Sequence, residues 1–168
     1  GIYNSKFFRT GHYELTPYSK TDLHSAMYVR LYELWKLAHI SEPRLDVIMS
    51  HDWPEYIAHY GDINALLRNH PFFKQSIDEN SLGCEAYLAL MKHLQPARWF
   101  SGHMHSHYTA VVPHAATSKK SASTAGKQVD LLTLLTQPQK VERKIPGAKP
   151  ATSSTATSET HFLALSKP

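Results

Sequence analysis

Hydrophobic residues follow two patterns along the chain: short apolar runs, and longer stretches in which they recur every three or four residues. The short runs predict buried β-strands at 45–49, 97–100 and 108–112. The longer stretches predict helices at about 22–39, 63–69 and 82–94. Asp22 can cap the first helix, whose apolar stripe leaves Arg30 to one side. Because helices and strands alternate, the pattern predicts an α/β sheet protein.

Two of the predicted strands stop at a small residue that is soon followed by histidine. The first run leads into Ser50 and His51, and the second leads into 101–105, Ser-Gly-His-Met-His. Strands that end at one edge of a sheet bring their next residues together, and binding sites of α/β proteins form there. Residues two apart on a strand point the same way, which aligns His103 with His105. Because imidazole is the commonest metal ligand, we predict a metal site built from these three histidines.

The neighbours of this motif are open to more than one interpretation. The carboxylate of Asp52 either orients the imidazole of His51 or of another ligand as a hydrogen-bond acceptor, or caps the turn that follows. His107 continues the face of the predicted ligands but lies past the site. The other histidines are interpreted as surface or helix residues, since imidazole is tolerated in many settings.

Residues 1–20 mix aromatic rings with basic side chains. Aromatic rings beside cations are what an unstacked RNA base and its phosphates require. Tyr13, Tyr18 and Arg30 are the candidate RNA contacts. The alternative is an ordinary loop whose aromatic rings pack into the core.

The composition changes after residue 114. Residues 115–160 are rich in Ser, Thr, Ala, Lys and Pro and contain no aromatic residue, which predicts a disordered insertion. Within it, the apolar stretch 129–135 can form a transient helix or dock elsewhere. Strand-like sequence resumes at 161–165, so the insertion lies inside a domain.

The overall composition narrows the class of protein only slightly. A formal net charge of +4 fits a polyanionic partner. The single cysteine, Cys84, excludes an intrachain disulfide and favours a reduced intracellular setting. No apolar run approaches the roughly 18 residues of a membrane span, so no membrane partner is predicted.

Several sequence blocks resemble known enzymes. Residues 102–105 are similar to the last signature block of the calcineurin-like metallophosphoesterases, Gly-His-x-His, and Ser50-His51 resembles the preceding single-histidine block. A longer series of pieces, nearly continuous over 1–114 and resuming near 160, resembles the RNA lariat debranching family. These pieces include Ser-His-Asp-Trp-Pro at 50–54, His-Tyr-Gly at 59–61, Ser-Leu-Gly at 81–83 and His-Phe-Leu-Ala-Leu at 161–165.

The resemblance implies part of a metallophosphoesterase β-sandwich flanked by helices, with two divalent metal ions, Mn, Fe or Zn. His51 and His103 would ligate one ion and His105 the other. It also implies hydrolysis of the 2′–5′ phosphodiester bond at the branch point of excised introns. The implied partners are branched (lariat) RNA and spliceosome-associated proteins, in the nucleus. Residues 1–20 would include the RNA-recognition loop, although Tyr28 stands where the family has a histidine.

The first three signature blocks of the superfamily are not found in the sequence. They are an Asp-x-His or equivalent, a bridging Asp within Gly-Asp, and Gly-Asn-His-Glu, and the last supplies the general acid. We therefore assign no catalytic residue here, and expect the N-terminal half to be missing and this chain alone to be inactive. It would be the C-terminal portion of a longer protein or the product of a truncated gene model.

On this view, residues 1–114 are the C-terminal portion of a catalytic domain. Residues 161–168 are then a returning strand of that domain or the start of the debranching-enzyme C-terminal domain. Two other functions remain open. One is a metallophosphoesterase that acts on phosphoprotein or nucleotide, and the other is a non-catalytic module that binds RNA or a partner protein.

Overall fold

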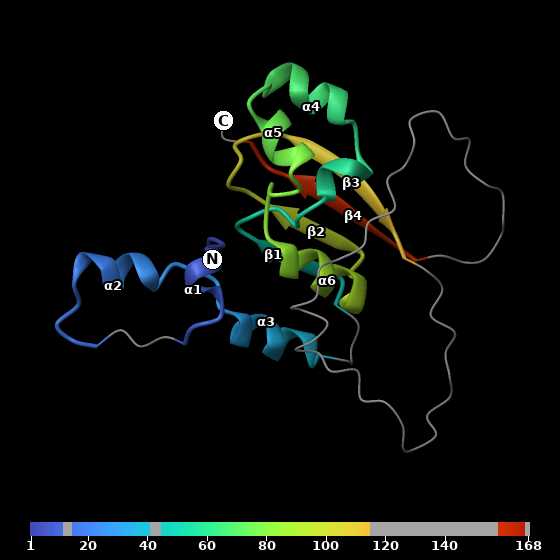
Figure 1. Cartoon of the computed structure of the whole chain (residues 1–168). Coiled ribbons are helices and arrows are strands. Elements are labelled where there is room, and N and C mark those ends of the chain that lie inside the picture. The colour runs from blue at the N-terminus through green and yellow to red at the C-terminus, as the bar shows by residue number, and fades with distance from the viewer. Residues whose placement is uncertain (12–14, 41–44, 115–157, 167–168) are drawn as a thin grey trace, which may run out of the picture.

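A four-stranded sheet forms the centre of the molecule (Figure 1). The computed structural model describes residues 1–11, 15–40, 45–114 and 158–166. Its strands are β1 (Val47–Ser50), β2 (Arg98–Ser101), β3 (Tyr108–Pro113) and β4 (Glu159–Ala164), in the order β1-β2-β4-β3. β2 is parallel to both β1 and β4, whereas β3 is antiparallel to β4. The predicted α/β class is therefore confirmed, as a mixed fold with one open sheet.

In the described part of the chain, three helices precede β1, and the other helices lie between β1 and β2. They are α1 (Ser5–Phe8), α2 (Lys20–Ser25), α3 (Leu31–Ala38), the 3-10 helix η1 (Ile57–Tyr60), α4 (Ile63–Asn69), α5 (Phe73–Asp78) and α6 (Glu85–Leu94). In Figure 1, α6 lies across the sheet, and α4 and α5 lie together near β3. α6 has Glu85 in its first turn and Lys92 and His93 in its last, an order that favours the helix dipole.

The two faces of the sheet are unlike. Towards α6, Trp99 and Phe162 are buried, and the ring of Tyr87 packs 5.9 Å from that of Trp99. On the opposite face, apolar side chains are exposed, with 77% of Met49 and 46% of Val47 accessible to solvent. Alternation of side chains along each strand produces this difference. The core of the described residues thus lies on one side of the sheet.

The single helix predicted at 22–39 is wrong, because the chain forms α2 and α3 with an extended segment between them. The backbone of Ile2 bonds to that segment: its N–H donates to the Met27 carbonyl at 3.0 Å, and its carbonyl accepts from Val29 N–H at 2.9 Å. These bonds require extended residues and stop the helix. The N-cap of α2 is Ser19, and Asp22 completes a capping box instead.

The ends of β3 and β4 lie beside each other. Pro113 pairs with Glu159, and His114 N–H donates to the Ser158 carbonyl at 2.8 Å. Of the insertion predicted at 115–160, residues 115–157 lie outside the described residues. Among the helices that the structure describes, none has the length and apolar character that crossing a membrane requires.

Candidate metal centre

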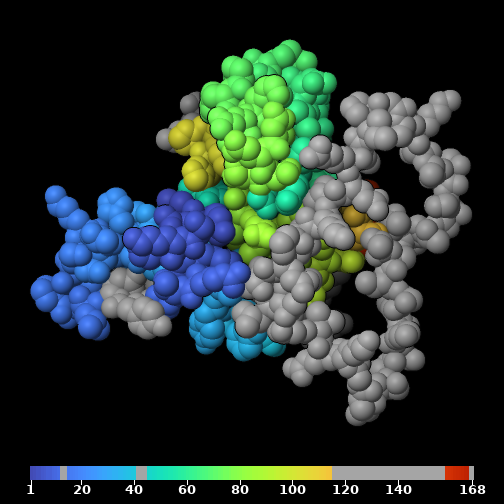
Figure 2. Space-filling view, in the orientation of Figure 1, coloured from blue at the N-terminus to red at the C-terminus, as the bar shows by residue number. Residues whose placement is uncertain are grey.

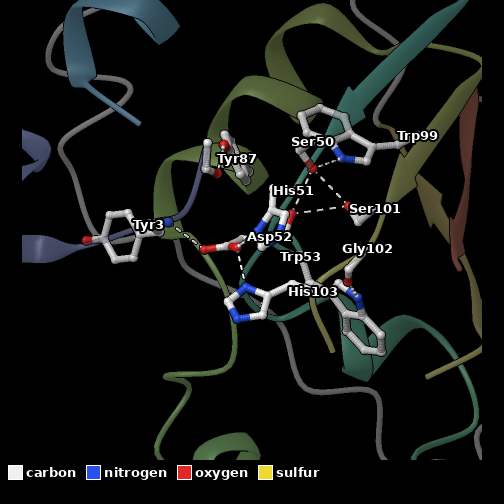
Figure 3. Close-up of polar contacts among 11 residues, drawn as sticks. Tyr3, Ser50, His51, Asp52, Trp53, Tyr87, Trp99, Ser101, Gly102 and His103 are labelled. Carbon is white, nitrogen blue, oxygen red and sulfur yellow. Dashed lines mark hydrogen bonds and ion pairs between the residues drawn. The ribbon is translucent and has the colours of Figure 1, made fainter. Parts of the chain in front are cut away.

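The loops that follow β1 and β2 meet at one edge of the sheet. These strands are parallel and in register, with Ser50 opposite Ser101. The loop that begins at His51 and the loop that begins at Gly102 therefore leave the sheet side by side (Figure 3). This is the convergence that the sequence predicted from the strand ends at Ser50 and Ser101.

Serine and tryptophan side chains join the two loops. The hydroxyls of Ser50 and Ser101 are 2.8 Å apart, and both reach the backbone carbonyl of Asp52, at 2.7 and 3.2 Å. The indole N–H of Trp99 donates to the Ser50 hydroxyl at 2.9 Å. The indole N–H of Trp53 donates to the Gly102 carbonyl at 3.0 Å. Because both indoles are buried, these bonds hold the loops in one geometry.

His51, Asp52 and His103 form the cluster that can hold a metal ion, and one ligand atom from each lies within 4.8 Å of the others. Nδ1 of His51 is 2.7 Å from Oδ1 of Asp52, and Nδ1 of His103 contacts the same oxygen. The two imidazole rings are 4.6 Å apart. The predicted proximity of His51 and His103 is thus observed, and Asp52 lies between their inner nitrogens.

The carboxylate of Asp52 connects three segments. Its second oxygen, Oδ2, accepts the backbone N–H of Tyr3 at 2.5 Å, and Figure 3 shows the carboxylate between Tyr3 and His103. The Asp52 side chain is 5% exposed, whereas the two histidine side chains are 44% and 39% exposed. These contacts fit the orienting interpretation of Asp52 rather than the turn cap.

This geometry has a chemical consequence. A carboxylate that accepts from Nδ1 of a neutral imidazole leaves the lone pair on Nε2, and metal-ligating histidines are commonly held in this way. The exposed rings of His51 and His103 can therefore present Nε2 to a cation, while Asp52 fixes their tautomer and orientation. Imidazole suits Zn and Fe, and carboxylate suits Mn, so a mixed set of these donors does not decide among the three ions.

His105 is placed differently from the prediction. Residues 102–107 form the loop between β2 and β3, so the strand-like alignment of His103 with His105 is wrong. Both residues have left-handed backbones, with φ of 65° and 49°. Such values are uncommon outside glycine and occur often at functional sites. In the described part of the chain the cluster does not include His105, which stays a predicted ligand.

The candidate RNA contacts are scattered. Tyr13 lies outside the described residues, and Tyr18 is 55% exposed. Arg30, the third candidate, is buried. Its guanidinium donates to the Phe7 carbonyl at 2.7 Å and to the Ser25 hydroxyl at 2.6 Å. Arg30 therefore joins α1 to α2, and its contact with RNA stays a prediction.

A carboxylate that the sequence did not single out lies near the cluster. Glu55 N–H donates to the Cys84 carbonyl at 3.1 Å, which brings it beside Glu85. Burial, with a smaller contribution from the charge of Glu85, raises the pKa of Glu55 to about 7. The pair joins segments about 30 residues apart, so no local pattern marks it.

Gly83 also contributes to this region. It has φ of 118°, and a Cβ there would approach the Trp53 carbonyl oxygen at 2.4 Å. Only glycine fits this close contact without strain. Cys84 N–H donates to the same carbonyl at 2.8 Å, which fixes the Trp53-Pro54 loop.

The sheet, with a histidine–carboxylate cluster in the loops that follow two parallel strands, defines an α/β protein with a candidate metal centre. Known sequences identify the family. The chain is 40% identical to the mouse lariat debranching enzyme over 134 residues, which cover 80% of this chain and 24% of that protein. It is 43% identical to the Arabidopsis thaliana enzyme over 68% of this chain and 27% of the relative. It is 39% identical to the human enzyme over 76% of this chain and 23% of the relative.

The matched part of this chain belongs to the lariat debranching enzyme family. The chain spans about a quarter of the length of the curated relatives it matches. No protein-family model matches it. A matched stretch of 134 residues must include both loops of the cluster, wherever in the 168 residues it begins.

Proposed function

We propose that this chain acts as part of a lariat debranching enzyme, a hydrolase that opens the 2′–5′ phosphodiester bond at the branch point of excised introns. The observation that carries the proposal is the 40% identity over 134 residues, which includes the histidine cluster. Similarity over the cluster loops supports shared chemistry, because those loops place the groups that would bind a metal.

The donor set supports a metal-dependent reaction. His51 and His103 would hold one divalent ion through Nε2, with Asp52 orienting both rings. His105 would serve a second ion, with the remaining ligands supplied from outside this chain. Such ions supply Lewis-acid polarisation of a phosphodiester and a water nucleophile at neutral pH. Whether they are Mn, Fe or Zn is not decided by imidazole donors.

The exposed apolar face of the sheet supports the β-sandwich architecture that the resemblance implies. Met49, Phe100 and Leu163 are paired side by side on that face, and Met49 is 77% exposed. An apolar sheet face is normally covered by another layer. We propose that a second sheet covers it and completes the metallophosphoesterase sandwich. Residues 1–114 and the strand near 161 would belong to this one domain.

The proposed substrate is branched RNA, and the proposed location is the nucleus, where introns are excised. Spliceosome-associated proteins are the proposed partners. The formal net charge of +4 is compatible with an RNA substrate.

A chimera tests the activity. The matching segment of the mouse relative is replaced by this chain, and the purified protein is incubated with Mn²⁺ and a synthetic 2′–5′ branched RNA. We expect linear products with a free 2′-hydroxyl at the branch nucleotide. The same chimera with His103→Ala should lose activity by orders of magnitude, since it lacks a ligand.

Two controls make the assay specific. His24→Ala removes an exposed histidine on α2, away from the cluster, and should leave the rate unchanged. Linear RNA of the same sequence should remain intact. A folded chimera that binds Mn²⁺ but leaves the branch uncut would refute the proposed function.

A further inference from the structure

Helix α3 presents a series of exposed aromatic rings. Tyr32 is 63% exposed and Trp35 is 37% exposed, and their rings are stacked with centroids 5.9 Å apart. The ring of His39 lies 4.2 Å from that of Trp35. Residues three and four apart share one side of a helix, so the three rings form a continuous row.

A groove runs beside this row, between the end of α1 and α3, and Figure 2 shows these two segments side by side at the surface. Its volume is about 440 Å³. The lining residues are Phe8, Arg9, Thr10, Gly11, Leu31, Tyr32 and Trp35. Most are aromatic or aliphatic, so the groove offers flat apolar surfaces that solvent can reach.

Positive charge borders the groove. Arg9 lines it, and the Lys36 ammonium lies 4.8 Å from the centre of the Tyr32 ring. None of the described lining residues is acidic. The carboxylate of Glu33, on α3, accepts the backbone N–H of Arg30 at the start of the helix. The charge of the described residues at this groove thus favours an anionic occupant.

Aromatic rings together with basic side chains select one class of anion. Unpaired nucleotides have a flat base that stacks on an aromatic ring and a phosphate that pairs with Lys or Arg. An acidic peptide would satisfy the charges but leave the ring row without a stacking partner. A duplex keeps its bases stacked internally and offers only phosphates to this groove.

The groove is connected to the candidate metal centre. The ring of Phe8 packs edge-on against the ring of Tyr3, with centroids 5.3 Å apart. The backbone N–H of Tyr3 in turn donates to Asp52. Phe8 and Tyr3 therefore link the groove to the histidine cluster by direct contacts.

We infer that the groove between α1 and α3 binds unpaired nucleotides of RNA, with Tyr32 and Trp35 stacking on bases and Arg9 and Lys36 contacting phosphates. Which RNA it holds in the cell rests on the proposed function: a single-stranded part of the intron next to the branch. The site itself requires only unpaired nucleotides.

Tryptophan fluorescence of the 168-residue chain tests this inference. Trp53 and Trp99 are 0% exposed, so quenching by a bound ligand reports on Trp35. A ten-nucleotide single-stranded RNA should quench this emission, and a duplex of the same sequence should not. Dissociation constants are measured separately by anisotropy of an RNA that carries a fluorescein label.

We expect Trp35→Ala to raise the dissociation constant for the single strand by at least about fivefold, the lower range for loss of one stacked base. Trp35→Phe should restore most of the affinity because it keeps an aromatic face. Lys36→Ala should weaken binding and make it less dependent on salt. Tyr32→Ala provides a second, independent variant, and thermal melts confirm that each variant is folded.

Matched controls lie outside the groove. Phe72→Ala removes an aromatic side chain that is 70% exposed next to α5, and Lys74→Ala removes a lysine that pairs with Asp78. Both should leave RNA affinity unchanged. Absence of RNA binding, or equal affinity in folded Trp35→Ala, Tyr32→Ala and the original chain, overturns the inference.

The RNA-binding groove and the debranching activity can be refuted independently of each other. Cleavage of branched RNA by the chimera, with no effect of the α3 variants on affinity, would refute the groove alone. Groove-dependent RNA binding without cleavage by the chimera would refute the enzymatic proposal alone.

Discussion

The two loops that form the candidate metal centre are built differently. The loop after β1 is largely internal, with Asp52, Trp53 and Pro54 buried. The loop after β2 exposes His103 and His105, both in left-handed backbone conformations. The first loop reaches the second through the Trp53 indole, which donates to the Gly102 carbonyl.

Different residues therefore hold the loops in position and would ligate the cation. Residues that never touch a cation, such as Trp53, keep the loop after β2 in position. The residues that would touch it are exposed and contribute little to packing. Substitution of the buried Trp53 should therefore lower stability, whereas substitution of the exposed histidines His51 and His103 should lower metal affinity while leaving the fold intact.

Trp53→Ala should produce the largest effect. Its side chain is 0% exposed and packs 5.3 Å from the ring of Tyr108 and 5.6 Å from that of Phe162. Truncating a buried tryptophan costs about 3–5 kcal/mol of unfolding free energy. Urea denaturation measures this change in unfolding free energy. The control is Trp35→Ala, which removes a partly exposed side chain and should cost under about 1 kcal/mol. Equal losses would show that the first loop is not the support.

Asp52→Asn should weaken metal binding more than folding. The amide keeps the size of the side chain but is a poorer acceptor for two imidazole N–H groups. Loss of such an orienting partner lowers metal affinity about 10- to 100-fold. Titration calorimetry with Zn²⁺ measures it, and Asp78→Asn on the exposed surface of α5 is the control. An unchanged affinity would remove Asp52 from the site.

Glu55 should make stability depend on pH. Its pKa is raised from 4.5 to about 7 because burial, and then the charge of Glu85, disfavour the carboxylate. A raised pKa in the folded state gives stability that is full below pH 4.5 and is lost as pH rises towards 7. After allowance for solvent screening we expect a loss of about 1–2 kcal/mol across this window.

Glu55→Gln should remove that dependence and stabilise the protein at pH 8, as thermal melts at several pH values will measure. Glu79→Gln is the matched control, since its exposed carboxylate bonds to the side chain of Gln75 on α5. A slope that persists in Glu55→Gln would assign the pH dependence to another group.

His105→Ala should have the smallest effect. The side chain is exposed and lies outside the three-residue cluster of the described chain, so stability should change by less than about 0.5 kcal/mol. The affinity for the cation held by His51 and His103 should change by less than about twofold. This change is well below the loss of affinity expected when an orienting carboxylate is removed. A loss as large as that of His103→Ala would place His105 in the same cation site.

The sequence predicted the meeting of His51 and His103 because each follows a short apolar run, and parallel strand ends share an edge. It could not predict the contact of Asp52 with the backbone of Tyr3, which lies 49 residues away in sequence. Helical spacing over 22–39 concealed the pairing of Ile2 with residues 27–29, because no local pattern reports a distant strand partner. The conformation at His105 was missed because strand periodicity was extended past the end of β2.

The paired ends of β3 and β4 have a practical consequence for protein engineering. Pro113 and Glu159 lie at the end of the sheet opposite the histidine loops, as Ser101 pairs with Ala164 at the other end. The polypeptide that joins two adjoining strand ends can change length at small cost, about 0.6 kcal/mol for each doubling. A fluorescent reporter or affinity tag grafted between them would therefore leave the candidate metal centre undisturbed.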